Sequence, residues 1–197
     1  MTPTRTSWAF IGAAAWLAGC ASTQLDAQWV DPQWAPGSLR GARVLVACEA
    51  SEAVVRRICQ DHVASDLVAR GATPVLAPDG APDDAAYAQA ARAAGARAIL
   101  TQQVAPYGST VSPGFTVGLG GFGFGSGGFG GGVGVSAPIG GGQVTTGYAA
   151  NARLVEAGTG RLIWSAKASS PPSHDVQTQM MELSRAVFAA ADKSGLF

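Results

Sequence analysis

The sequence predicts an α/β (α+β) domain with the element order βαβαβ-ββ-α, in which helices pack on a mixed sheet. Three short apolar runs are separated by two segments with the periodicity of amphipathic helices. Two alternating segments around a glycine turn then predict a β-hairpin, and a last amphipathic segment follows it. Because helices lie between the first three strands, we expect crossover connections in that part of the sheet.

The first strand and the first helix are predicted from an apolar run and a four-residue repeat. Residues 44–48 are all apolar, as in a buried strand. Ser51 is the expected N-cap of the following helix, and Gly71 is expected just after its end. One face of this helix carries Val55, Cys59, Val63 and Leu67.

A second strand, a second helix and a third strand follow. Residues 74–77 are a short strand after which the chain loops to Asp83. Asp83 begins an alanine-rich helix that runs to about residue 94 and is closed by Gly95. Residues 97–101 begin the third strand, which we expect to continue through Val104.

The last third of the domain is predicted to be a hairpin and a helix. Residues 148–154 alternate apolar and polar side chains, which is typical of a strand with one buried face. Residues 157–160 turn the chain, and residues 162–165 return as the partner strand. After Pro171 and Pro172, one face of a final helix carries Val176, Met180, Leu183, Val187 and Ala190.

Residues 1–19 have the anatomy of a lipoprotein signal peptide. Arg5 precedes an apolar stretch at residues 8–16, which is too short to remain as a span of ~20 residues. Residues 17–20 read Leu-Ala-Gly-Cys and match a lipobox, so we expect cleavage between Gly19 and Cys20 and a covalent lipid on the Cys20 thiol. Two acyl chains would hold the protein stably on a membrane. The alternative is an ordinary cleaved signal followed by a chance cysteine.

After cleavage, residues 20–42 are expected to be a lipidated tether, and residues 43–197 a single periplasmic domain. Asp31-Pro32 and residues 35–37 (Ala-Pro-Gly) interrupt any regular pattern in the tether. Ala21, by resemblance to the sorting rule of Gram-negative lipoproteins, implies an outer-membrane anchor with the domain facing the periplasm. Trp29 and Trp34 either lie at the lipid interface or fold back onto the domain, and we favour the second interpretation.

Charge and cysteine content restrict the function. Acidic and basic residues balance at 13 each, which leaves no basic field for a nucleic acid. With Cys20 lipidated, Cys48 and Cys59 form an even pair in an oxidising compartment. We slightly favour a disulfide between them. The alternative is a pair of small buried core residues, because a strand-to-helix turn could hold their Cα atoms beyond the ~7 Å that a disulfide allows.

Residues 108–142 form a glycine-rich insertion. They contain 16 of the 27 glycines, so ordering them would be entropically costly. We expect a mobile loop or a poorly ordered extension of the flanking strands. Matches to GxGxxG in this segment lack the following helix and acidic residue that nucleotide binding needs. An alternative is that its phenylalanines dip into a bilayer as a β-hairpin.

Catalytic signatures are missing from the sequence. His62 and His174 are far apart along the chain, and no GxSxG, HExxH or phosphate-loop motif occurs. Cys48 with His62 could imitate a thiol nucleophile and its base, but apolar neighbours would raise the thiol pKa. We therefore expect no enzyme activity, no metal, no cofactor besides the lipid on Cys20, and no small-molecule substrate.

Several segments resemble small α/β lipoproteins of the bacterial envelope. Residues 95–101 are similar to a strand of these proteins, and residues 151–165 to their hairpin motif. The resemblance extends to residues 29–32, residues 54–57 and the last helix. The motif residues are Arg153, Leu154, Glu156, Thr159, Gly160 and Trp164.

The wider group includes lipoprotein activators of penicillin-binding proteins, the amino-terminal domain of TolB and the curli secretion lipoprotein. This resemblance implies a non-enzymatic binding domain. We therefore predict an interaction module of the cell envelope with a protein partner, held to membrane lipid by its acyl anchor. The alternative is an oligomeric secretion or pore-type lipoprotein whose Phe/Gly-rich segment lies in the membrane.

Overall fold

The computed structural model describes residues 22–78, 83–112 and 143–197. Nine elements follow in the order β-βαβαβ-ββ-α, which confirms the predicted fold class and adds one strand before it. Among the described residues, no helix combines the length and the apolar character needed to cross a bilayer. The elements are β1 (Gln24–Val30), β2 (Arg43–Glu49), α1 (Ala53–Ala69), β3 (Thr73–Leu76), α2 (Asp84–Ala93), β4 (Ala98–Ser112), β5 (Gln143–Glu156), β6 (Leu162–Ser173) and α3 (Val176–Lys193).

The strands form one mixed sheet in the order β1-β6-β5-β4-β2-β3. β2 runs parallel to both β3 and β4, as the two helical crossovers require. β4, β5, β6 and β1 pair antiparallel in turn. The sheet therefore joins a small parallel unit to a larger antiparallel one.

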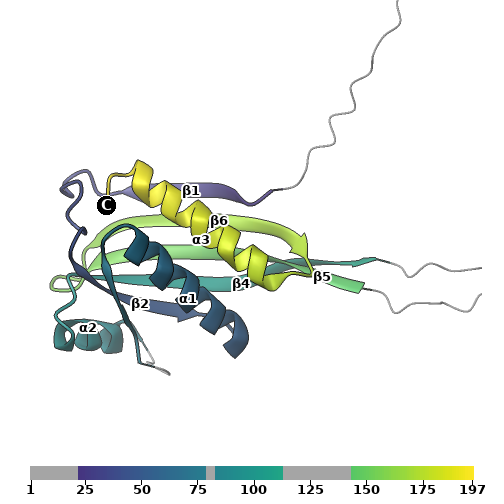
Figure 1. Cartoon of the computed structure of the whole chain (residues 1–197), viewed down its shortest axis with the longest axis horizontal. Coiled ribbons are helices and arrows are strands. Elements are labelled where there is room, and N and C mark those ends of the chain that lie inside the picture. Colours follow the sequence, from purple (N-terminus) through teal and green to yellow (C-terminus); the bar gives the residue numbers. More distant parts are fainter. Residues whose placement is uncertain (1–21, 79–82, 113–142) are drawn as a thin grey trace, which may run out of the picture.

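Two helices cover one face of this sheet. Figure 1 shows α1 and α3 side by side across the strands. Alternate residues of the strands point toward these helices, so the cluster between the layers is continuous from β2 to β6. Burial of this apolar surface is the main force that holds the layers together. Its largest wholly buried side chains include Trp164, Phe188, Leu67 and Ile163.

α2 covers only a small part of the opposite face. Tyr87 and Ala91 of α2 pack on Leu45, Ala47 and Ile99 of β2 and β4. Asp83 caps this helix as predicted, because its side chain accepts a hydrogen bond of 2.9 Å from the Ala86 N–H. No described helix lies over the same face of β5, β6 and β1.

Arg70 links the two helices that share the covered face. Its Nε and Nη2 donate to the two carboxylate oxygens of Asp192 at 2.8 and 2.9 Å, and its Nη1 donates to Asp66 at 3.0 Å. The guanidinium also lies 4.7 Å from the centre of the Phe188 ring. Burial lowers the pKa of Arg70, but these carboxylates raise it more, so the net shift is upward. The cluster joins the end of α1 to the end of α3.

Two expectations from the sequence are wrong in detail. Residues 24–30 are not part of a free tether, because they form β1 and pair with β6. Ser51 is not the N-cap of α1, since Glu52 holds that position without a side-chain cap bond. β4 continues past Gly108 to Ser112 against β5, so one flanking strand extends into the glycine-rich insertion, as one of the two expectations for this segment allowed. Residues 113–142, and the expectations for them, lie outside the described residues.

Candidate functional site

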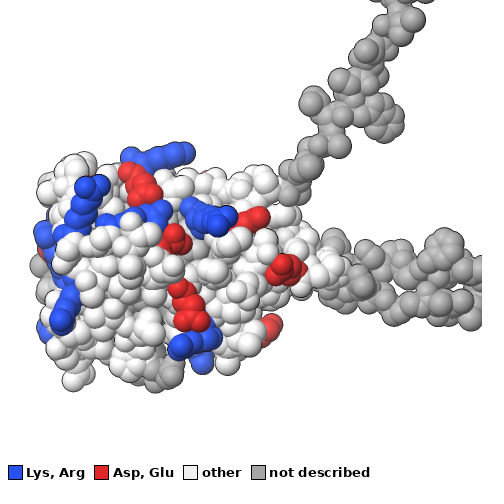
Figure 2. All heavy atoms as spheres, in the orientation of Figure 1, with Lys and Arg blue, Asp and Glu red and all other residues white. Residues whose placement is uncertain are grey.

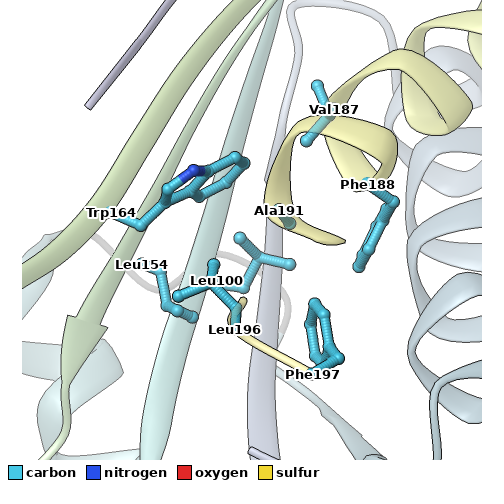
Figure 3. Close-up of a pocket in the computed structure, with 8 residues that line it drawn as sticks. All are labelled: Leu100, Leu154, Trp164, Val187, Phe188, Ala191, Leu196 and Phe197. Carbon is cyan, nitrogen blue, oxygen red and sulfur yellow. The ribbon is translucent and has the colours of Figure 1, made fainter. Parts of the chain in front are cut away.

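The apolar cavity between the sheet and α3 is too small for a ligand. Figure 3 shows the side chains that line it, and its volume is about 10 Å³. A single water molecule needs at least about 10–15 Å³. This cavity is therefore not a ligand site. The cavity is lined by Leu100, Leu154, Trp164, Val187, Phe188, Ala191, Leu196 and Phe197.

The most distinctive surface is the face of the antiparallel strands that no described helix covers. We call it the open face, and register defines its members. Trp29, Ser165, Arg153 and Thr101 form one row across four strands. The adjacent row consists of Ala27, Lys167, Asn151 and Gln103.

The two rows of the open face border a shallow depression. Its volume is about 340 Å³, and the backbone of β5 and β6 forms its floor. Trp29 stands at one side with 46% of its surface exposed, and Arg153 stands at the other. The depression thus offers an aromatic ring, two amine or guanidinium donors, amides and hydroxyls on a rigid sheet.

The two cations of the open face are weakly neutralised. Arg153 Nη2 lies 3.7 Å from Asp84 Oδ2, and both side chains are more than half exposed. An exposed pair of this kind contributes about 0–1 kcal/mol, so Arg153 can exchange this partner. Lys167 is exposed and has no ion pair with a described carboxylate. The charged groups are therefore free to bind an external acceptor.

A smaller hollow of about 90 Å³ adjoins the open face beside α2. Arg153 lines both hollows, and Tyr87 lies in the smaller one. The Tyr87 hydroxyl donates to Glu49 Oε1 at 3.3 Å. Burial and the charge of Glu49 raise the pKa of Tyr87, which keeps the phenol protonated as a donor.

Three residues of the hairpin motif build its turn. Thr159 Oγ1 donates to Glu156 Oε2 at 2.6 Å and accepts from the Arg161 N–H at 3.2 Å. Gly160 has a φ of 71°, a conformation that glycine adopts without strain. Its N–H closes the turn on the Glu156 carbonyl at 2.8 Å. These positions shape the turn, and Glu156 and Gly160 also line the smaller hollow beside α2.

The other motif residues divide between the core and the surface. Leu154 and Trp164 face α3 and are 2% and 1% exposed. Arg153 points to the opposite side of the same strand and is the one motif side chain of the open face. The motif predicted from sequence is thus largely a folding motif with a single position on the open face.

Cys48 and Cys59 are joined in a disulfide that ties the end of β2 to α1. Their Cα atoms lie 6.1 Å apart, within the range that a disulfide allows. Both cysteines are buried, and neither has a thiol available as a nucleophile. Within the described ranges, no group of histidine, cysteine and carboxylate side chains is arranged to hold a metal ion. Gly19 and Cys20 lie outside the described residues.

The two tryptophans of the expected tether have different positions. Trp34 folds back onto the domain, where the Arg97 guanidinium lies 5.5 Å from its ring centre. Trp29 lies in β1 and remains exposed on the open face. Sequence reasoning did not place Trp29, Lys167 and Asn151 together, although the period-two alternation of both hairpin strands was the available signal.

Comparisons with known proteins find only a weak structural likeness. No family model and no curated protein matches the chain. A PelC dodecamer from Paraburkholderia phytofirmans is 14% identical, with 84% of this chain and 96% of that chain covered and a TM-score of 0.49. A single-residue variant of that protein is also 14% identical, with 82% of this chain and 94% of that chain covered and a TM-score of 0.48. A PDZ domain protein from Parabacteroides distasonis is 11% identical, with 82% of this chain and 34% of that chain covered and a TM-score of 0.35.

Proposed function

We propose that this chain is a non-enzymatic interaction module of the bacterial envelope. A lipid on Cys20 would hold it on the periplasmic side of the outer membrane, and the open face would bind an envelope protein. The open face is the observation that supports this function most directly. It leaves a tryptophan and two weakly paired cations on a rigid surface, and Trp and Arg are the residues most enriched at the energetic centres of protein interfaces.

The side chains of the open face favour binding over catalysis. A nucleophile needs an adjacent base within hydrogen-bond reach, and general acid–base chemistry needs a group that titrates near neutrality. The two rows of the open face contain no histidine, cysteine or carboxylate. Their arginine, lysine, amide and hydroxyl groups can hold a partner but supply no base.

Photo-crosslinking in intact cells tests the open face. A crosslinker at Ala27, in the edge strand β1 and on the lining of the depression, should capture a defined envelope protein. Trp29→Ala should reduce that product at least tenfold, because an interface tryptophan typically contributes about 2 kcal/mol or more. The fold should be unaffected, since Trp29 is 46% exposed.

Val68 provides the matched control for this experiment. It is an apolar residue of α1 that is 61% exposed on the other side of the molecule. Val68→Ala should leave the crosslinked product unchanged, and a crosslinker at Ser65 should not form it. Equal capture from Ser65 and Ala27, or no sensitivity to Trp29→Ala, would refute binding through the open face.

The anchor is tested separately by Cys20→Ser. This variant should lose all labelling by a palmitate analogue and keep residues 1–19, because the modified thiol and the cleavage site are the same residue. Membrane fractionation and intact-mass measurement report both changes. The double variant Cys48→Ala/Cys59→Ala should label normally. Normal maturation and localisation of Cys20→Ser would exclude the lipoprotein assignment.

One observation favours the oligomeric secretion or pore-type alternative. β4 and β5 continue as a two-stranded arm past the end of β6, with Thr110 opposite Thr145 and Ser112 opposite Gln143. Figure 1 shows this arm leaving the body of the domain. Stable rings in detergent and conductance in planar bilayers would support the alternative. A monomer without conductance would remove it.

A further inference from the structure

Cationic side chains gather at the end of the sheet opposite the β4–β5 arm. Main-chain hydrogen bonds hold the loops of this end together. The Gly41 N–H donates to the Gly71 carbonyl and the Gly37 N–H donates to the Gly195 carbonyl, both at 2.8 Å. Figure 2 shows lysine and arginine along the edge of the molecule at that end. We call this surface the basic end. It consists of Arg40, Arg43, Arg92, Arg97 and Lys193, all exposed.

Two aspartates near the basic end are already paired with other cations. Arg161 Nη1 binds Asp31 Oδ2 at 2.9 Å, and Arg70 holds Asp192 through both of its oxygens. None of the five residues of the basic end forms an ion pair with a described carboxylate. Acidic and basic residues balance at 13 each over the whole chain, so the excess of cations at this end is local.

Two of the five side chains are held in place by the main chain. Arg43 Nη1 donates to the Ala94 carbonyl at 3.0 Å, and Arg97 Nη1 donates to the Ser38 carbonyl at 2.8 Å. Each guanidinium has five N–H groups, so most of its donors remain available. The basic end therefore presents four guanidinium groups and the ammonium group of Lys193, and two of the guanidinium groups are held in place.

The direction of β1 sets where a membrane anchor would lie relative to the basic end. β1 begins at Gln24 beside Ser169 and ends at Val30 beside Trp164, so it runs toward the basic end. Three residues separate Cys20 from Gln24, and an extended chain reaches only about 3.5 Å per residue. A lipid on Cys20 would thus hold the end of the domain where β1 begins close to the bilayer, and the basic end would lie away from it.

We propose that the basic end is a docking surface for an aspartate- and glutamate-rich segment of a second envelope protein. Arginine recognises carboxylates through two parallel hydrogen bonds, as Arg70 does with Asp192 in this chain. A protein is the partner rather than a bilayer because the basic end points away from the anchored membrane. That choice rests on the proposed anchor, whereas the charge complementarity does not.

A direct titration tests this surface. The full lipidated chain in detergent micelles is titrated against a fluorescent peptide of eight glutamates at low salt. Arg40→Gln/Arg92→Gln/Lys193→Gln should weaken binding at least tenfold. The control Arg56→Gln/Arg57→Gln/Arg185→Gln removes the same charge away from the basic end and should weaken it less than twofold. Binding by the unmodified chain should fall as salt rises, because exposed charges are screened.

Three results would overturn the proposal. Absence of peptide binding would remove the docking surface. Equal loss in both triple variants would show that only net charge matters. Binding to vesicles that contain phosphatidylglycerol, with the same dependence on Arg40, Arg92 and Lys193 but no peptide binding, would show a lipid surface instead. Palmitate labelling of the same preparation reports the anchor independently, so failure of the anchor and failure of the basic end are distinguishable.

Discussion

Replacing Trp164 by alanine is expected to lower the free energy of unfolding by about 3–5 kcal/mol, the usual cost of truncating a buried tryptophan. Trp164 belongs to β6 and is 1% exposed, and its side chain packs in the core between the sheet and α3. Figure 3 shows its ring beside Leu154 and Val187, on the wall of the small core cavity. Truncation would enlarge that cavity at the point where the sheet meets α3. Urea unfolding followed by circular dichroism measures the loss.

Trp164→Phe is the matched control for this prediction. The Trp164 Nε1 is buried without a described hydrogen-bond partner, so phenylalanine removes an unsatisfied donor along with some volume. We expect Trp164→Phe to cost less than half as much as the alanine variant. If the free energy of unfolding of Trp164→Ala lies within about 1 kcal/mol of that of the unmodified chain, the packing of α3 on the sheet is not as described.

Removing the disulfide is expected to lower the free energy of unfolding by about 3 kcal/mol. Cys48 and Cys59 are separated by 11 residues in sequence, and the bond restricts this loop in the unfolded chain. The loop-entropy relation gives about 3 kcal/mol for a closed loop of this length. Reduction after denaturation, followed by refolding under reducing conditions, should therefore shift the urea midpoint of the unmodified chain downward.

The variant Cys48→Ala/Cys59→Ala separates the bond from its environment. It should be less stable than the oxidised chain and insensitive to reductant, because no disulfide remains to be broken. Thiol titration of the denatured, unreduced chain should find neither Cys48 nor Cys59 free. Detection of both thiols would contradict the disulfide, and an unchanged urea midpoint after reduction would contradict its contribution to stability.

The elements predicted from sequence are those with strong local patterns. The four-residue repeat of α1 and the alternation of β5 arise from burial of one face, so both elements occur where expected. Asp83 and Gly71 also have their predicted roles at helix ends, since capping depends on neighbouring residues. The Cys48–Cys59 pairing could only be weighed as one of two possibilities, because it depends on how the β2–α1 turn is built.

β1 and the open face could not be predicted in the same way. Residues 24–30 have little apolar periodicity, and they become a strand by pairing with β6, which is about 140 residues away in sequence. Without β1, Trp29 belongs to a tether and has no place in the row of the open face that contains Arg153. The same limit applies to the basic end, whose residues come from loops and from the ends of strands and helices that are far apart in sequence.

The amino-acid sequence alone determined the α/β class, the order of the strong elements and the expectation of a lipid on Cys20, because each follows from patterns within a few residues or turns. Tertiary structure alone decided that α1 and α3 share one face of the sheet while most of the other face stays open. It also decided which side chains meet on the open face and at the basic end. Strand pairing and layer packing join residues far apart in sequence, and local propensity contains no information about those contacts.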